Sequence, residues 1–99
     1  MLPNGAYAVG ILWQGKWHGG IANIGDNPTF EGCQRRIEVN IFDFSSDIYD
    51  QEILVDFYQK LREEKKFSSV EGLVSQLHRD KAMASALWRK VQGEVESVR

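Results

Sequence analysis

The chain has 99 residues, of which 42% are hydrophobic and 11% aromatic, which fits one folded globular domain and argues against disorder. A net charge of -2 lacks the basic excess that binding to a phosphate backbone needs, so nucleic acid is not an expected partner. No apolar run approaches the roughly 20 residues of a membrane span and no signal segment opens the chain, so no membrane role is expected either.

Two strands are predicted at the start of the chain. Residues 6–13 and 16–24 are rich in strand formers, and the two-residue polar break Gln14-Gly15 between them is typical of a hairpin turn. The strands should therefore be antiparallel neighbours. Gly19 and Gly20 lie inside the second strand, where glycine indicates a bulge or a close backbone approach.

A third strand is predicted over residues 36–44, after a loop over residues 25–33. Apolar and polar side chains alternate along it, with Ile37, Val39 and Ile41 on the core face and Arg36, Glu38 and Asn40 on the other. Glu38 is therefore directed away from the core. A carboxylate fixed on a strand can serve as a general base, although a glutamate in this setting is more commonly a solvated surface residue.

The fourth strand is predicted over residues 52–60, after a polar connection over residues 45–51. Ile53, Val55 and Phe57 should face inward, with Leu54 an apolar exception on the other face. Because no helix separates these four strands, they predict an antiparallel sheet curled into a small barrel, which would be incomplete here.

One amphipathic helix should follow the strands. Val70, Leu73, Val74 and Leu77 recur at helical spacing, and Ser68 with Glu71 three residues later resembles a capping box. Helix formers continue to about Val91, and Gly93 is a weak stop signal.

Five sequence blocks together resemble the riboflavin kinase family. They are GAYAV (5–9), NIGDNPTF (23–30), RRIEVNIFDF (35–44), DIY (47–49) and LREEKKF (61–67). They occur in the family's order with similar spacing, and the similarity runs from about Leu2 to about Asp80. The resemblance implies a mainly β fold: a small antiparallel, Greek-key type β-barrel of the riboflavin kinase type with a C-terminal α-helix. In bacteria this domain is usually the C-terminal half of a bifunctional riboflavin kinase and FAD synthetase.

The same resemblance implies transfer of the γ-phosphate of ATP to the 5′-hydroxyl of riboflavin, giving FMN and ADP, with Mg²⁺ bridging the phosphates. Glu38 matches the family's catalytic base. Arg62, Glu64 and Phe67 match a flap beside the isoalloxazine ring. Asp47 and Tyr49 match a loop at the adenine end of the nucleotide.

The sequence also departs from the family pattern. Asp50 stands where the family commonly has glycine, so the loop around Tyr49 would reach a positive φ less easily. Asn40 stands where many relatives carry histidine. The charged run 62–66 is also readable as a solvated connection, with Phe67 as a hydrophobic staple ahead of the helix.

The family begins with a strand and a Pro-Thr-Ala-Asn motif that binds phosphates and magnesium. This chain is expected to start after that motif, because the similar letters NPTF (27–30) belong to a later loop. The expectation is one riboflavin kinase-like domain over residues 1–99, truncated at its N-terminus. Three possibilities stay open: a working kinase domain, an inactive fragment or flavin-binding module, and a shortened form of an active parent.

Three further expectations concern metals, partners and location. His18 and His78 have no ligand-spaced carboxylate or cysteine, so no metal site is predicted. The open sheet edge left by the absent first strand would favour self-association. The single Cys33 cannot form an internal disulfide, which fits a reducing cytoplasm as the expected location.

Overall fold

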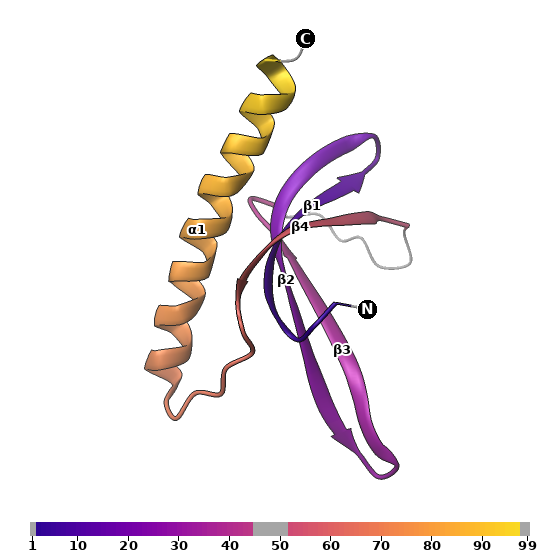
Figure 1. The fold of residues 1–99 in the computed structure, drawn as a ribbon, viewed down its shortest axis with the longest axis vertical. Helices are drawn as coiled ribbons and strands as arrows, with labels where there is room; N and C mark the ends of the chain where they lie inside the picture. The colour runs from indigo at the N-terminus through magenta and orange to yellow at the C-terminus, as the bar shows by residue number, and fades with distance from the viewer. Residues whose placement is uncertain (1, 45–51, 98–99) are drawn as a thin grey trace.

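The computed structural model describes residues 2–44 and 52–97, which form a four-stranded antiparallel sheet with a long helix beside it (Figure 1). The elements are β1 (Gly5–Trp13), β2 (Lys16–Thr29), β3 (Gly32–Ile41), β4 (Leu54–Arg62) and α1 (Val70–Ser97). The strand order β3-β2-β1-β4 is that of a Greek key, since the fourth strand returns to lie beside the first. This confirms the predicted mainly β fold with a C-terminal helix. Within the described residues β3 and β4 are the two edges, so this part of the barrel is open.

The hairpin between β1 and β2 forms as predicted. Trp13 pairs with Lys16, and the two residues between them have positive φ, 49° at Gln14 and 76° at Gly15. Two positive φ values define the type I′ turn, whose twist matches that of the flanking strands. Glycine at the second position makes this conformation easier to reach.

The loop predicted over residues 25–33 is wrong, because β2 and β3 stay paired as far as Thr29 and Gly32. The pairing of β1 with β2 ends at Gly5 and Ile24, so the far end of β2 pairs with β3 alone and extends beyond the rest of the sheet (Figure 1). Turn-forming residues are tolerated there because β2 pairs with a neighbouring strand on one side only, so the backbone groups on its other side need no partner strand. Pro28, which has no N–H to donate, lies in this two-stranded part.

The third strand also ends earlier than predicted. It closes at Ile41, and Phe42 and Asp43 form a turn in which Asp43 has a φ of 50°. Asparagine and aspartate adopt this left-handed conformation more readily than other non-glycine residues, which explains why the strand breaks here.

A hydrophobic core covers the sheet face that carries the odd-numbered residues of β1. Its buried members are Tyr7, Val9, Ile11, Ala22 and Ile24, and the partly buried Val39, Ile41, Ile53, Val55 and Phe57 pack against them. The inward positions predicted for β4 are thus confirmed, and Leu54 is exposed as expected for the other face. Ile37 differs from its prediction: it is 56% exposed, because it lies on the part of β3 that extends toward the protruding hairpin.

Helix α1 packs on the opposite face through small residues. Ala8 and Ile21 contact Ala84 of the helix in a second buried cluster. Further along, Gly10 and Gly19 are register partners on β1 and β2, and Trp88 lies over both. A Cβ atom at Gly19 would lie 2.5 Å from Cγ of Trp88. Gly19 therefore serves a close approach, one of its two predicted roles, and Trp88 packs against it.

The ends of the helix differ from their predictions. Ser69, not Ser68, is the N-cap, since its Oγ accepts a hydrogen bond of 3.1 Å from the backbone N–H of Gly72. The predicted capping box of Ser68 with Glu71 is therefore wrong by one residue. The helix also continues to Ser97, because a glycine such as Gly93 costs a helix only about 1 kcal/mol and does not by itself end it.

Candidate functional site: a cleft between the β2–β3 hairpin and the helix

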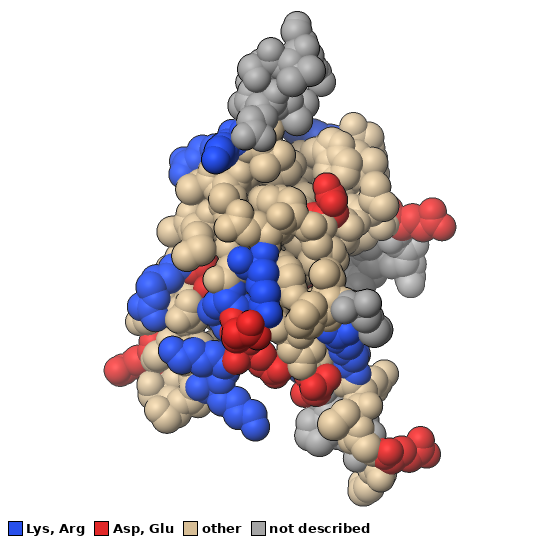
Figure 2. Space-filling model, viewed as in Figure 1, with Lys and Arg blue, Asp and Glu red and all other residues tan. Residues whose placement is uncertain are grey.

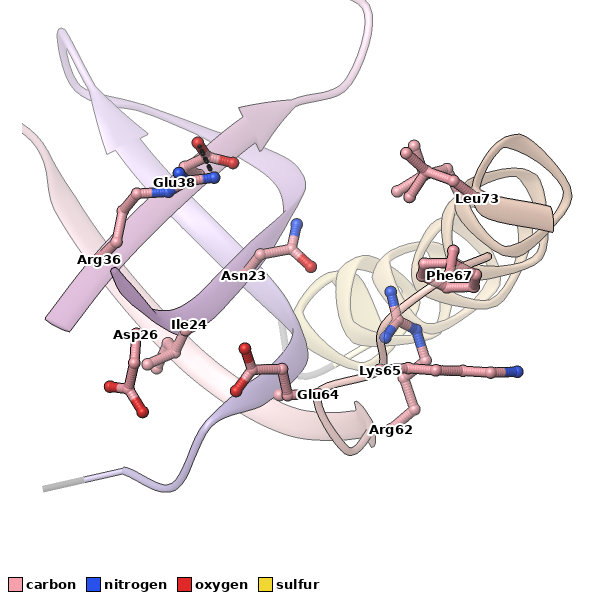
Figure 3. Close-up of a pocket in the computed structure, with 13 residues that line it drawn as sticks. Asn23, Ile24, Asp26, Arg36, Glu38, Arg62, Glu64, Lys65, Phe67 and Leu73 are labelled. Atoms are coloured by element: carbon pink, nitrogen blue, oxygen red, sulfur yellow. Dashed lines mark ion pairs between the residues drawn. The ribbon is translucent and has the colours of Figure 1, made fainter. Parts of the chain in front are cut away.

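A cleft of about 400 Å³ lies between the β2–β3 hairpin and the first half of α1 (Figure 3). Its volume is within the range of about 300–1,000 Å³ typical of small-molecule sites. Its lining comes from both walls and from the β4–α1 connection: Gly5, Asn23, Ile24, Gly25, Asp26, Arg36, Glu38, Arg62, Glu64, Lys65, Phe67, Leu73 and Leu77. The candidate residues Glu38, Arg62, Glu64 and Phe67 are thus brought together in one cleft.

The sheet supplies a polar wall. Asn23 and Glu38 are register partners on β2 and β3, so their side chains lie next to each other on the helix side of the sheet. Arg36 Nη2 lies 2.7 Å from Glu38 Oε1, and the Glu38 side chain is 59% exposed. An ion pair this exposed contributes at most about 1 kcal/mol, so a hydroxyl group can replace Arg36 as the partner of Glu38 at little cost.

The helix supplies an apolar wall. Phe67, Leu73 and Leu77 line this side, with Phe67 and Leu73 facing the sheet across the cleft in Figure 3. The helical spacing of the two leucines suggests a core face, but they are partly exposed because the sheet beneath them turns polar. The Phe67 ring also lies close to the first helical turn, where a Cβ on Gly72 would be 3.7 Å from its Cδ1.

In the connection from β4 to α1, the two candidate polar residues, Arg62 and Glu64, each contact another part of the chain. Arg62 forms an ion pair with Asp80 of the helix, with Nη2 2.8 Å from Oδ2. Asn4 Nδ2 donates to Glu64 Oε2 at 3.0 Å and to Asp26 Oδ2 at 2.8 Å, which ties the connection to the start of the chain and to β2. Figure 2 shows basic and acidic side chains gathered together over this part of the molecule.

A second pocket of about 280 Å³ adjoins the cleft and shares Asn23 and Leu77 with it. Asn40 lines this pocket from β3 and His78 from the helix. Asn40 is therefore near the cleft without lining it; the β3 residues that line the cleft are Arg36 and Glu38. Asp47 and Tyr49, the predicted nucleotide-loop residues, lie outside the described residues, as does Asp50.

Several lining residues were not singled out in the sequence. Asn23 alternates with Ile21 and Gly25 along β2, and this polar interruption of an apolar strand was a usable signal. Asp26 and Asn4 had no such signal, since they depend on the β2–β3 pairing and on the path of the N-terminal segment.

Comparisons with known proteins identify the family. The family model for riboflavin kinase, named Flavokinase, matches residues 1–88. The chain belongs to the riboflavin kinase family. It is 43% identical over 84 residues to the bifunctional riboflavin kinase/FMN adenylyltransferase of Pseudomonas fluorescens, and 39% identical over 85 residues to that of Bacillus subtilis strain 168. These matches cover 84% and 83% of this chain but only 27% of each relative.

A solved structure shares the fold of this chain. It is a crystal structure of a Streptococcus pneumoniae protein described as a macrolide-efflux protein, with a TM-score of 0.79 and 39% identity. The match covers 86% of this riboflavin kinase-family chain and 28% of that one. No helix in the described part of the present chain is long and apolar enough to cross a membrane.

Carboxylates line the cleft of this riboflavin kinase-family chain without forming a cluster. Over residues 2–44 and 52–97, no three side chains of the types His, Cys, Asp and Glu lie together. The carboxylates of Asp26 and Glu64 are instead joined through Asn4.

Proposed function

We propose that this chain is a domain that transfers the γ-phosphoryl group of ATP to the 5′-hydroxyl of riboflavin, giving FMN and ADP. The observation that supports this most strongly is the position of Glu38 on the polar wall of a cleft whose opposite wall is apolar. A flavin needs an apolar wall for its flat, largely apolar ring and a polar wall for the hydroxyl groups of its ribityl chain. The family relationship supplies the same reaction.

In the proposed reaction Glu38 accepts the proton of the 5′-hydroxyl. The hydroxyl oxygen forms a bond to the γ-phosphorus, the bond from that phosphorus to the β–γ bridging oxygen breaks, and ADP leaves with the electron pair. The 5′-proton moves to a carboxylate oxygen of Glu38. The strand holds this carboxylate in place, and its exposed pair with Arg36 can open for the substrate.

The other walls have proposed binding roles. The isoalloxazine ring would lie against Phe67, Leu73 and Leu77, since flat aromatic surfaces pack well on one another and on aliphatic groups. Glu64 would meet the polar edge of the ring, with Arg62 next to it in the same connection. Asp47 and Tyr49 remain predicted contacts of the nucleotide, with ATP as co-substrate.

A second candidate is flavin binding without turnover. It is favoured by one observation, the lack of a metal-ligand cluster in the described residues, because Mg²⁺ and phosphate contacts supply most of the catalysis in phosphoryl transfer. Under this candidate the cleft keeps its affinity for riboflavin while FMN formation is negligible.

The experiment is to compare Glu38→Gln with the unchanged chain in riboflavin binding and in FMN formation with Mg-ATP. Glutamine keeps the size of the side chain but cannot accept the proton, so turnover should fall by about 100-fold or more while the riboflavin Kd changes little. Glu52→Gln is the matched control, since Glu52 is exposed, lies just before β4 and is outside the cleft lining.

Three outcomes separate the candidates. Full turnover in the Glu38→Gln protein would remove this residue from the mechanism. Riboflavin binding without turnover in the unchanged chain supports the second candidate. No riboflavin binding contradicts both.

We also propose that the chain self-associates and works in the cytoplasm. Within the described residues β3 and β4 each pair on one side only, and an open edge can accept a strand from a second copy. The exposed, free thiol of Cys33 fits a reducing compartment. Sedimentation at rising concentration tests the first proposal, and a monomer at every concentration would contradict it.

A further inference from the structure

Asp80 is a buried carboxylate that the flavin chemistry does not use. It lies on α1 and is only 2% exposed. Arg62, the last residue of β4, donates from Nε to both carboxylate oxygens at 3.0 Å and from Nη2 to Oδ2 at 2.8 Å. Gln76, one helical turn earlier, adds a hydrogen bond from Nε2 to Oδ1 at 2.9 Å. This two-point geometry fixes the plane of the Arg62 guanidinium group as well as its position.

The ion pair of Arg62 with Asp80 joins the two ends of the β4–α1 connection that lines the cleft. Residues 63–69 lead from the end of β4 to the start of α1, and Asp80 lies ten residues into the helix, about 15 Å along its axis. The bond between Arg62 and Asp80 therefore sets the spacing between the end of β4 and the helix. That spacing determines how far the apolar wall stands from the polar wall with Glu38.

Arg62 passes this restraint on to the flap itself. Its Nη1 donates to the carbonyl oxygen of Glu63 at 3.2 Å, which fixes the first peptide of the connection. Its Cζ lies 6.0 Å from the centre of the Phe67 ring, within the range of a cation–π contact. In Figure 3 Arg62 and Phe67 lie side by side at the helix end of the cleft.

We propose that Asp80 is a positioning residue for flavin binding: it acts through Arg62 to hold Phe67 and the 63–67 connection in the conformation that receives the isoalloxazine ring. The identity of the ligand rests on the proposed function, whereas the ordering of the connection does not. Arg62 thereby acts mainly as the link between helix and flap. Asp80 itself does not line the cleft.

A buried ion pair that only stabilises the fold predicts something different. Its loss would lower the melting temperature, but protein that remains folded would bind riboflavin normally. The distinction therefore requires affinity measured at a temperature where circular dichroism shows every variant to be folded.

The test uses Asp80→Asn, Arg62→Lys and the double variant, with riboflavin as the titrant and its fluorescence as the signal. Asparagine keeps the size of Asp80 but loses the charge, and lysine keeps the charge of Arg62 but loses the planar fork. Each single change should raise the Kd for riboflavin by about 10-fold, about 1.4 kcal/mol. The Kd of the double variant should be about the same as that of the weaker-binding single variant, because both changes break the same link. Glu52→Gln, an exposed change just before β4 and outside the cleft lining, should leave the Kd unchanged.

Amide hydrogen exchange without riboflavin tests the ordering separately. Exchange at residues 64–67 should be faster in folded Asp80→Asn than in the unchanged chain, while exchange in β1 and β2 stays the same. Unchanged exchange together with an unchanged Kd in folded Asp80→Asn would overturn the proposal. Faster exchange with no riboflavin binding by any form would confirm that Asp80 orders the connection, but would contradict both the flavin as its ligand and the proposed function. If Asp80→Asn does not fold, hydrogen exchange of Arg62→Lys decides: unchanged exchange at residues 64–67 would overturn the proposal, whereas its Kd also reflects the contact of Arg62 itself with the ring.

Discussion

The substitution Gly19→Ala tests how the helix is docked on the sheet, and therefore how the cleft is formed. The new Cβ would lie 2.5, 2.6 and 2.9 Å from Cγ, Cδ1 and Cδ2 of Trp88, distances that real Cβ atoms essentially never show. The tryptophan ring must therefore move, and it is confined between Gly10 on β1 and the ring of Tyr58, whose centre is 6.4 Å away. Overpacking of this kind costs about 1–3 kcal/mol.

Part of that cost is offset, because alanine loses less backbone entropy on folding than glycine, by about 0.4–1 kcal/mol. We therefore expect a net loss of about 1–2 kcal/mol. For a domain of this size each kcal/mol lowers the melting temperature by about 4–8 °C. Urea unfolding followed by circular dichroism gives the free energy directly, and thermal melting gives an independent check.

A double-mutant cycle assigns the effect to the contact. In a Trp88→Leu background the ring is absent, so Gly19→Ala should become neutral or slightly stabilising, with a coupling of at least about 1 kcal/mol. If Gly19→Ala proves as stable as the unchanged chain with Trp88 in place, the helix does not lie against this glycine pair and the docking described above is wrong.

Two further predictions concern stability. The hydroxyl of Tyr58 is buried and has no hydrogen-bond partner among the described residues, so Tyr58→Phe should be neutral or stabilising by up to about 1 kcal/mol in urea unfolding. Burial, and secondarily the charge of Asp56, raise the pKa of Tyr58 above 10.0, so the folded state keeps this proton when the unfolded state has lost it. Stability should therefore fall as the pH rises above 10, and less so in Tyr58→Phe; an identical pH dependence would contradict this. At the helix start, Ser69→Ala should cost about 1 kcal/mol and Ser68→Ala almost nothing, and the reverse order would restore the cap first predicted from the sequence.

Local rules predicted those elements whose signals lie within a few residues. The turn at Gln14-Gly15 and the inward side chains of β4 depend on turn chemistry and on the two-residue period, and both formed as expected. The loop predicted over residues 25–33 was wrong because its turn residues lie where β2 pairs on one side only, which is a property of the whole sheet. The sequence of β2 or β3 alone does not show that this part of β2 pairs on one side only.

The site was predictable only in part for the same reason. Arg36 and Glu38 could be assigned to the polar face of one strand from alternation alone, but the neighbour Asn23 follows from the register between β2 and β3. Leu77 has the spacing of a core residue, and its place beside a cleft depends on where the sheet becomes polar. Asp80 carried no sequence signal, because the partner that makes it important, Arg62, is eighteen residues away on another element.

The most direct test of the central claim, that the cleft receives a flavin, is to follow backbone amide NMR signals of the labelled chain while riboflavin is added. The account predicts saturable shifts at Asn23 and Glu38 on the sheet wall and at Phe67 and Leu77 on the helix wall. Shifts confined to the other end of the helix, around Arg89, or no saturable shifts at all, would contradict it.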